Sequence, residues 1–322
     1  MTTPALPIWL ESTYASLIKR FRENTLGHAP LLYGPQGAGK YALADTLARS
    51  VLCGHYSDDG LPCGECVSCR LLAVGNHPDR FDIKPLEAGK AITVDQVRGL
   101  IEQLALTPAM GQYRLGVITP AESMNINASN ALLKSLEEPP DNVLLILVSH
   151  REQALLPTIL SRCQKVPISV PSQATSLEWL EVHSSSADSS LHQLALRMSS
   201  GAPLLADHYI ETGQVEEARE ILSELLNIAG GGGVSPDLAE RWAAQADSVW
   251  SWLAFWVSEI ARSAASGEST AELAPLLSSS SDIDWSELWK GALEGRGLSG
   301  SGIRHDLLLG RWLLVWESVV YR

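Results

Sequence analysis

The chain has no long apolar run, few basic residues and no basic or apolar leader at its start. A helix needs about 20 consecutive apolar residues to cross a bilayer, and no stretch of the sequence supplies them. Residues 1–4 lack the basic and apolar regions of a secretory signal. We therefore expect a soluble protein of the cytoplasm with no membrane partner.

Basic residues are outnumbered, with 24 against 37 acidic ones and a formal net charge of −13. A surface that binds nucleic acid strongly by electrostatics alone needs an excess of lysine and arginine, and this chain has none to spare. The imbalance is uneven, because residues 1–166 carry 15 basic and 16 acidic residues, leaving 9 and 21 for the remainder. Any direct DNA contact is expected in the N-terminal half.

A phosphate-binding loop with the sequence GPQGAGK occupies residues 34–40. The residues that define it are Gly34, Gly37, Gly39 and Lys40. In such loops the glycines let backbone N–H groups close around phosphate oxygens, and the lysine reaches the terminal phosphates. The magnesium ligand is missing, because Tyr41 stands where a serine or threonine hydroxyl should hold the ion.

A second magnesium ligand is missing from the strand that should end in an acidic pair. The strand at residues 114–118 is followed by Thr119 and Pro120, and neither can carry a negative charge. Lys40 could then sit in a loop that binds nucleotide weakly, binds it without turnover, or merely keeps its fold. We expect weak or absent binding, because Mg²⁺ normally neutralises charge on the triphosphate. The loss of both magnesium ligands predicts a protein that keeps the fold of an ATPase but does not hydrolyse ATP.

Strands alternate with helices in the first half of the chain. The expected strands are residues 28–33, 81–85, 115–118 and 143–149, and the expected helices are residues 8–25, 41–52, 94–106 and 128–136. This alternation predicts a mostly parallel sheet covered on both faces, which is the α/β class. After Pro167 and Pro171 the strand-like runs disappear and the remainder is expected to be helical.

Cysteine is scarce, but four of the five cysteines lie close together. Cys53, Cys63, Cys66 and Cys69 are separated by nine, two and two residues. Thiolates two residues apart can bind one ion, and four complete the closed tetrahedral shell of a structural zinc site. Disulfides are disfavoured in the cytoplasm, and a redox Cys-x-x-Cys pair is the remaining alternative. We expect structural zinc in an insertion at residues 53–69.

The order of these motifs resembles that of a known family. The loop and the cysteine insertion are followed by NALLKSLEEPP at residues 130–140 and by SRC at residues 161–163. Over residues 8–166 the pattern is similar to the clamp-loader subunits of bacterial DNA polymerase III, which are AAA+ proteins. In that family the hydrolysing gamma and tau subunits keep the loop hydroxyl and the acidic pair, whereas the delta-prime type commonly loses them. The chain resembles the delta-prime type.

The resemblance implies a division of the chain and a set of partners. It implies an AAA+ P-loop domain at residues 1–166, a small helical lid at 167–211, and a helical collar domain at 212–322 that assembles subunits into a ring. The implied partners are the gamma/tau ATPase subunits and the delta subunit. The sliding clamp and primed DNA would be met through the assembled complex, a component of the DNA-directed DNA polymerase holoenzyme.

Arg162 takes a specific role from the resemblance. In the family this arginine projects into the ATP site of a neighbouring subunit and stabilises charge on the transferred phosphoryl group. Such a finger is worth ~10³–10⁵-fold in rate in phosphoryl-transfer enzymes. Without the motif, the simpler interpretation of Arg162 is a pair with a local carboxylate. We expect a structural subunit that is catalytic in trans.

Two other functions stay open from the residues themselves. The chain could be a gamma/tau-type subunit that hydrolyses ATP with divergent magnesium ligands, a hypothesis that depends on Tyr41, Thr119 and Pro120. It could also be a zinc-dependent interaction module with no link to phosphoryl transfer. ATP turnover by the chain alone would indicate the first of these functions. Loss of partner binding on removal of zinc, with no effect of Arg162→Ala on the activity of the complex, would indicate the second.

Three further features have ordinary explanations. Ser149 lies about where the family has its sensor-one polar residue, and a structural hydroxyl at a strand end explains it equally well. Glu137 and Glu138 point in different directions on a helix that two prolines end, so we assign them no catalytic role. Eight of the ten tryptophans fall between residues 242 and 316, and their helical spacing favours core packing over subunit contacts.

Overall fold

The computed structural model describes residues 6–55, 57, 59–87, 89–267, 272–277, 284–298 and 302–320. The chain divides into two compact units, one ending at His208 and the other beginning at Tyr209. Across the described ranges, every helix is too short or too polar to span a bilayer. The domain boundaries expected at 166/167 and 211/212 stay predictions.

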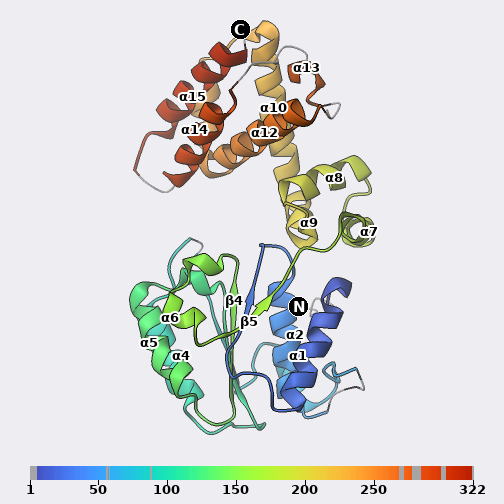
Figure 1. Ribbon diagram of the computed structural model, residues 1–322, viewed down its shortest axis with the longest axis vertical. Helices are drawn as coiled ribbons and strands as arrows, with labels where there is room; N and C mark the ends of the chain where they lie inside the picture. Colours follow the sequence, from blue (N-terminus) through green and yellow to red (C-terminus); the bar gives the residue numbers. More distant parts are fainter. Residues whose placement is uncertain are drawn as a thin grey trace. The chain divides into compact units, whose positions relative to one another are not determined.

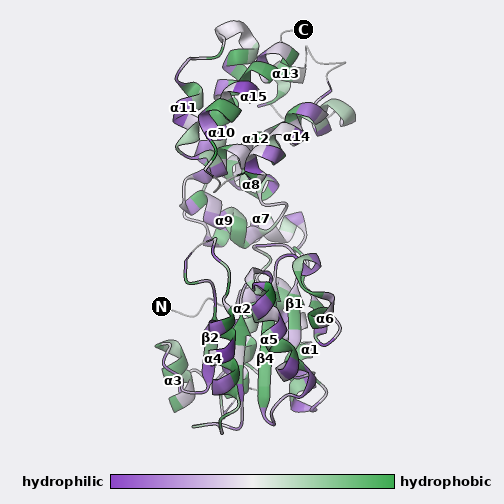
Figure 2. Ribbon diagram, turned by 90° about the vertical axis from the view of Figure 1, so that its left-hand side faces the viewer, coloured by the Kyte–Doolittle hydropathy of each residue, from purple (hydrophilic) through white to green (hydrophobic). Residues whose placement is uncertain are grey.

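A parallel five-stranded sheet forms the centre of the first unit (Figure 1). Its strands are β1 (Pro30–Tyr33), β2 (Arg80–Ile83), β3 (Arg114–Ile118), β4 (Val143–Ser149) and β5 (Gln164–Pro167). The order across the sheet is β2-β3-β4-β1-β5. In Figure 2 β4 is coloured as hydrophobic, as expected for a central parallel strand that is covered on both faces. The predicted α/β class is confirmed.

Helices cover both faces of this sheet, with α1 and α2 on one side and α4 and α5 on the other (Figure 1). The elements around the sheet are η1 (Ile8–Leu10), α1 (Glu11–Arg22), α2 (Lys40–Leu52), α3 (Val67–Ala73), α4 (Val94–Leu104), η2 (Ala121–Ser123), α5 (Ile126–Glu137), η3 (Glu152–Ala154) and α6 (Pro157–Leu160). One apolar cluster includes Leu17 of α1 and Leu43 of α2. A second includes Leu100 of α4 and Leu132 of α5. Burial of these two layers holds the strand ends in fixed positions.

The register of the sheet brings several strand ends to one edge. Tyr33 at the end of β1 pairs with Ser149 of β4 on one side and with Pro167 of β5 on the other. Ile118 at the end of β3 pairs with Leu147 of β4. Ligands of open α/β sheets bind outside the carboxyl ends of the strands, so side chains just beyond these residues form the candidate site.

All four predicted strands and all four predicted helices of this unit are present, with ends shifted by a few residues. The elements that were not predicted are the helices α3 and α6, the strand β5 and the short turns η2 and η3. The strand β5 has the sequence QKVP, and its edge position explains why it lacks an apolar run. The helices α3 and α6 span only seven and four residues, too short for a helical period to be recognised.

Three helices follow the sheet along the chain, and the boundary between the two units falls within the third. They are α7 (Gln173–His183), α8 (Ser189–Met198) and α9 (Pro203–Glu211). The Ser172 hydroxyl caps α7 by accepting the Thr175 N–H at 3.2 Å, and the Asp188 carboxylate caps α8 by accepting the Ser190 N–H at 2.8 Å. The serine-rich stretch after His183 therefore separates two capped helices.

The described part of the second unit is helical, as predicted. Its elements are α10 (Gln214–Asn227), η4 (Ile228–Gly232), α11 (Leu238–Ala243), α12 (Ala246–Ser266), α13 (Ala274–Leu277), α14 (Ser286–Gly297) and α15 (His305–Val320). Trp256 and Trp316 are fully buried, and their indole N–H groups donate to backbone carbonyls at 2.7 and 3.2 Å. Trp289 is 41% exposed. Core packing is thus confirmed for most of the tryptophans, with Trp289 as the exception.

Candidate functional site

The phosphate loop connects β1 to α2, which is the predicted order of strand, loop and helix. Gly37 and Gly39 have φ angles of +77° and +94°, a region that residues with a side chain enter only with strain. The loop ends at Lys40, the first residue of α2. Backbone N–H groups at a helix N-terminus attract anions, so the backbone retains the form of a phosphate cradle.

Apolar side chains lie directly against this loop. A Cβ atom placed on Gly37 would lie 2.4 Å from Leu205 Cβ. A Cβ atom on Gly39 would lie 2.7 Å from Leu10 Cδ1 and 3.6 Å from Leu204 Cδ1. Leu204 and Leu205 belong to the first turn of α9. The loop is therefore packed against leucines, which offer no positive charge to a triphosphate.

Lys40 is turned toward its own loop. Its ammonium Nζ donates to the carbonyl oxygen of Pro35 at 2.5 Å, and the residue is only 2% exposed. Burial lowers the pKa of Lys40 to about 8, and the negative charge of Glu122 opposes this shift. The lysine that should bind phosphate is thus buried and hydrogen bonded within the protein.

The two positions at which a phosphate-loop protein normally holds magnesium lack the usual ligands. Tyr41 replaces the loop hydroxyl, and Thr119 and Pro120 replace the acidic pair. The Tyr41 side chain is on the surface, with the residue 47% exposed. Thr119 and Pro120 directly follow β3. Ser149 is buried at the end of β4, where its hydroxyl oxygen accepts the Arg151 N–H at 3.2 Å, as expected for a structural hydroxyl at a strand end.

A carboxylate that the sequence reasoning missed lies close by. Glu122 Oε1 accepts the backbone N–H of His150 at 2.9 Å. Glu122 Oε2 and His150 Nδ1 are buried, and no hydrogen-bond partner within the described ranges reaches either atom. Burial lowers the pKa of His150, and the charge of Lys40 adds to the effect. Glu122 follows β3 and His150 follows β4, and both strands end at the phosphate-loop edge, so their place just after a strand is the sequence signal for both residues.

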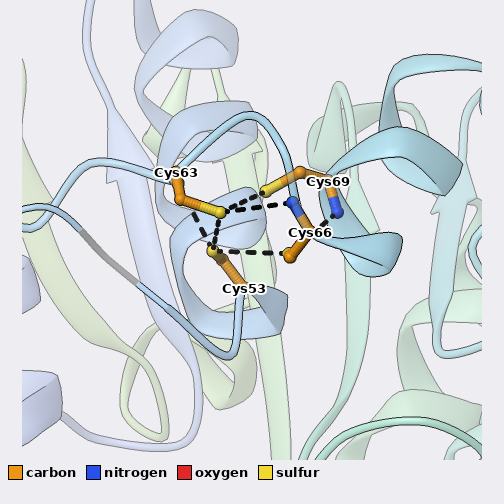
Figure 3. A group of neighbouring side chains, drawn as sticks. All are labelled: Cys53, Cys63, Cys66 and Cys69. Atoms are coloured by element: carbon orange, nitrogen blue, oxygen red, sulfur yellow. Dashed lines mark hydrogen bonds between the residues drawn. The ribbon is translucent and has the colours of Figure 1, made fainter.

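The four clustered cysteines converge on one point from the end of α2, the loop that follows it and the start of α3 (Figure 3). Sγ of Cys53 lies 3.6 Å from that of Cys63 and 3.8 Å from that of Cys66, and Cys63 Sγ lies 3.9 Å from Cys69 Sγ. Four sulfurs placed about 2.3 Å from a tetrahedral zinc ion would be about 3.8 Å apart. All five cysteines are free thiols, so the cluster can hold a metal ion.

Backbone groups support thiolates in this cluster. The N–H groups of Cys63, Cys66 and Cys69 each donate to the sulfur of the preceding cysteine in the group at 3.4 Å. The N–H of Cys66 is the main reason that the pKa of Cys63 falls to about 6. Burial raises the pKa of Cys53 and of Cys69. A bound cation would offset that cost and favour the thiolate form of all four.

Arg162 lies in the turn between α6 and β5 with its side chain 33% exposed. Its Nη2 atom is 2.5 Å from Glu137 Oε1, and its Nη1 donates to the carbonyl oxygen of Thr158 at 2.9 Å. The structure therefore shows the pair with a local carboxylate that was the simpler interpretation of Arg162. This pair is compatible with an arginine that reaches a neighbouring subunit, because the guanidinium is also exposed to solvent.

Comparison with known proteins agrees with this architecture. A family described as "DNA polymerase III, delta subunit" matches residues 9–172. DNA polymerase III subunit delta' of Pseudomonas aeruginosa is 38% identical over 255 residues, which cover 79% of this chain and 76% of that protein. The same subunit of Haemophilus influenzae is 36% identical over 220 residues, which cover 68% of this chain and 66% of that protein.

A solved structure extends the likeness to the fold. The DNA polymerase III gamma subunit-related protein of Thermotoga maritima superimposes with a TM-score of 0.54 at 16% identity, covering 95% of this chain and 99% of that one. At that identity the match concerns the fold alone. Together with the family match and the curated relatives, it assigns this chain to the delta-prime clamp-loader subunits of bacterial DNA polymerase III, on an AAA+ fold.

Proposed function

We propose that this protein is a delta-prime-type subunit that does not hydrolyse ATP itself and supplies Arg162 to the ATP site of a neighbouring subunit. Its partners are then the gamma/tau ATPase subunits and the delta subunit. The assembled complex loads the sliding clamp on primed DNA during replication. In this arrangement residues 167–211 act as a helical lid and residues 212–322 as the collar that joins the subunits.

The observation that carries the proposal is the packing of the phosphate loop. Leucines contact Gly37 and Gly39, and Lys40 donates to Pro35 within the loop. A triphosphate would have to displace these contacts without help from a magnesium ligand at Tyr41 or Thr119. The loop is thus better suited to holding α2 and α9 together than to holding a nucleotide.

Arg162 supports the catalytic half of the proposal. Its guanidinium is accessible at the protein surface, and guanidinium binds phosphate oxygens in a planar, bidentate geometry. Positive charge placed at the transferred phosphoryl group stabilises the transition state of hydrolysis in the neighbour. Nothing in this role requires nucleotide in the loop of the subunit that carries the arginine.

The cysteine cluster supports a structural role for zinc. Four thiolates fill the tetrahedral shell and leave no position for a substrate, so Cys53, Cys63, Cys66 and Cys69 would hold the ion. Bound zinc would supply only cross-linking, tying the end of α2 to α3. A zinc-dependent interaction module remains the alternative if zinc removal, and not loss of Arg162, abolishes all activity of the complex.

The main alternative function, a gamma/tau-type subunit that hydrolyses ATP, would depend on Glu122. A gamma/tau-type ATPase with divergent ligands needs a carboxylate near Lys40, and Glu122 has an unpartnered buried oxygen within the described ranges. Magnesium-dependent ATP turnover by the purified chain decides between the two, with Lys40→Ala as the control for contaminating ATPases. We expect equal background rates in both proteins. Turnover by the wild type that disappears in Lys40→Ala and in Glu122→Gln would overturn the proposal and show an ATP-hydrolysing subunit of the gamma/tau type.

The role of Arg162 is tested in a clamp loader reconstituted with gamma/tau and delta. We expect Arg162→Ala to slow clamp loading at least about tenfold, because a trans arginine contributes strongly to phosphoryl transfer. Arg98→Ala is the matched control, since Arg98 is an exposed arginine on α4 with only a 3.9 Å pair to Asp95. An Arg162→Ala complex that loads clamps at the normal rate would refute the catalytic half.

A further inference from the structure

Two motifs that are distant in the sequence meet in one ion pair. Glu137 is the last residue of α5, and Arg162 lies in the turn before β5. Their side chains approach to 2.5 Å between Oε1 and Nη2, with the glutamate 51% and the arginine 33% exposed. The pair therefore joins the end of one helix to the turn that carries the proposed finger.

The guanidinium is held at more than one point. Its Nη1 donates to the Thr158 carbonyl oxygen at 2.9 Å and to the Ser161 hydroxyl oxygen at 3.3 Å. Glu137 receives a bond from Nη2. Arginine has five N–H donors, so two of them have no acceptor in the described part of the chain. The side chain is oriented by three acceptors and still has donors to offer a phosphate.

The position of Glu137 is unfavourable for α5 taken alone. The C-terminal end of a helix repels negative charge, and Pro139 and Pro140 prevent the helix from continuing. The next residue, Glu138, has left helical geometry with φ −125° and ψ 73°. The Arg162 guanidinium offsets the helix-end penalty at Glu137, which couples the end of α5 to the orientation of the arginine.

We infer that Glu137 is a positioning residue for Arg162. The inference depends on the proposed function, in which Arg162 acts on the ATP of a neighbouring subunit. A long, partly exposed arginine has many rotamers, and ordering it during the reaction would slow that reaction. Pairing with Glu137 orders the side chain in advance, when the subunit folds, as the supporting residues of a catalytic group do.

The test compares two adjacent glutamates in the reconstituted clamp loader. Glu137→Gln keeps the side-chain size and removes the charge, and we expect the kcat of clamp loading to fall roughly threefold to fivefold, the upper part of the range for a partly exposed ion pair. The KM for ATP should stay unchanged, because the arginine acts in the transition state. Glu138→Gln makes the same charge change one residue later and should load clamps at the wild-type rate.

A double-mutant cycle separates positioning from a general structural effect. If Glu137 acts through Arg162, Glu137→Gln should cause no further loss in an Arg162→Ala background. The same fold loss in both backgrounds, or a Glu137→Gln complex with wild-type kcat, would overturn the inference. Gel filtration of each complex checks that assembly is intact.

The outcomes also separate this inference from the proposed function. An Arg162→Ala complex with normal loading removes both the finger and the need to position it. An impaired Arg162→Ala complex beside a normal Glu137→Gln complex removes only the positioning role. Impairment of both, without additivity, supports both.

Discussion

Gly37 contacts Leu205 so closely that a Cβ atom on the glycine would lie 2.4 Å from the leucine Cβ and 2.7 Å from its backbone nitrogen. The second atom belongs to the backbone of α9, so rotation of a side chain cannot relieve the contact. Glycine at this position thus serves packing between the loop and a helix. Gly37 thus meets two structural demands at once, the left-handed backbone of the loop and the close approach of α9.

Substitution of Gly37 by alanine should destabilise the first unit. The left-handed φ of +77° and the overpacked contact together should cost roughly 2–4 kcal/mol. Gly75→Ala is the matched control, because Gly75 has a φ of +74° but no neighbour within 4 Å of its Cβ position. Hydrogen-exchange protection of the α2 amides under increasing urea measures the difference. Equal losses in the two variants would contradict the close packing at Gly37.

Lys40 should give the stability of the protein a distinctive pH dependence. Its folded pKa of about 8 lies below its ordinary value of 10.5, so the unfolded chain binds the Lys40 proton more tightly. Below about pH 8 the full penalty of burying the charge is present. Between about pH 8 and 10.5 the folded state loses the proton first, and stability rises with pH by at most about 3 kcal/mol.

A comparison of variants isolates this contribution. The stability of the wild type relative to Lys40→Met should increase between pH 8 and 10.5, as measured by urea unfolding at a series of pH values. Lys134→Met, which removes an exposed lysine of α5, is the control for charge alone. A flat difference between the wild type and Lys40→Met would mean that Lys40 is not held in a desolvated site.

Local patterns in the sequence were sufficient for much of the fold. The apolar run of β4 predicts a strand, and the glycines at residues 34, 37 and 39 predict a loop of the phosphate-binding form, whose residues 37 and 39 have left-handed backbone. The spacing of Cys63, Cys66 and Cys69 likewise predicts a common ion site, because thiolates with two residues between them can bind the same ion. In each case the chemistry that decides the structure lies within a few residues.

Contacts between distant segments could not be predicted in the same way. The leucines at residues 204 and 205 look like ordinary helix residues until α9 is placed against the phosphate loop. Glu137 likewise looks like a solvated helix end, and only the folded chain brings it to Arg162. Neither relationship has a local period or motif, because each depends on packing between elements that are far apart in the sequence.

The cysteine cluster should bind one zinc ion for each chain. Cys66→Ser removes one thiolate ligand but leaves a hydroxyl that can still cap α3, where Cys66 Sγ accepts the Cys69 N–H. We expect the zinc content of the purified protein, measured by elemental analysis, to fall well below one per chain. Cys163→Ser is the control, because Cys163 lies outside the cluster and burial raises its pKa to about 11. Zinc loss in both variants, or in neither, would contradict the four-thiolate site.

The second unit should depend on one buried tryptophan far more than on an exposed one. Trp256 has no exposed surface and donates its indole N–H to the carbonyl oxygen of Ala218 at 2.7 Å, so Trp256→Ala should cost about 3–5 kcal/mol, mainly through the cavity that it leaves. Trp289→Ala removes a ring that is 41% exposed and should cost under about 1 kcal/mol in the isolated chain. Hydrogen exchange in α12 under urea measures both effects. If the two losses of stability were similar, the tryptophans of this unit would not act mainly as core residues.

If Trp289→Ala instead left the isolated chain intact but weakened assembly with the other subunits, the exposed ring of Trp289 would be the one tryptophan ring of this comparison that serves an interface.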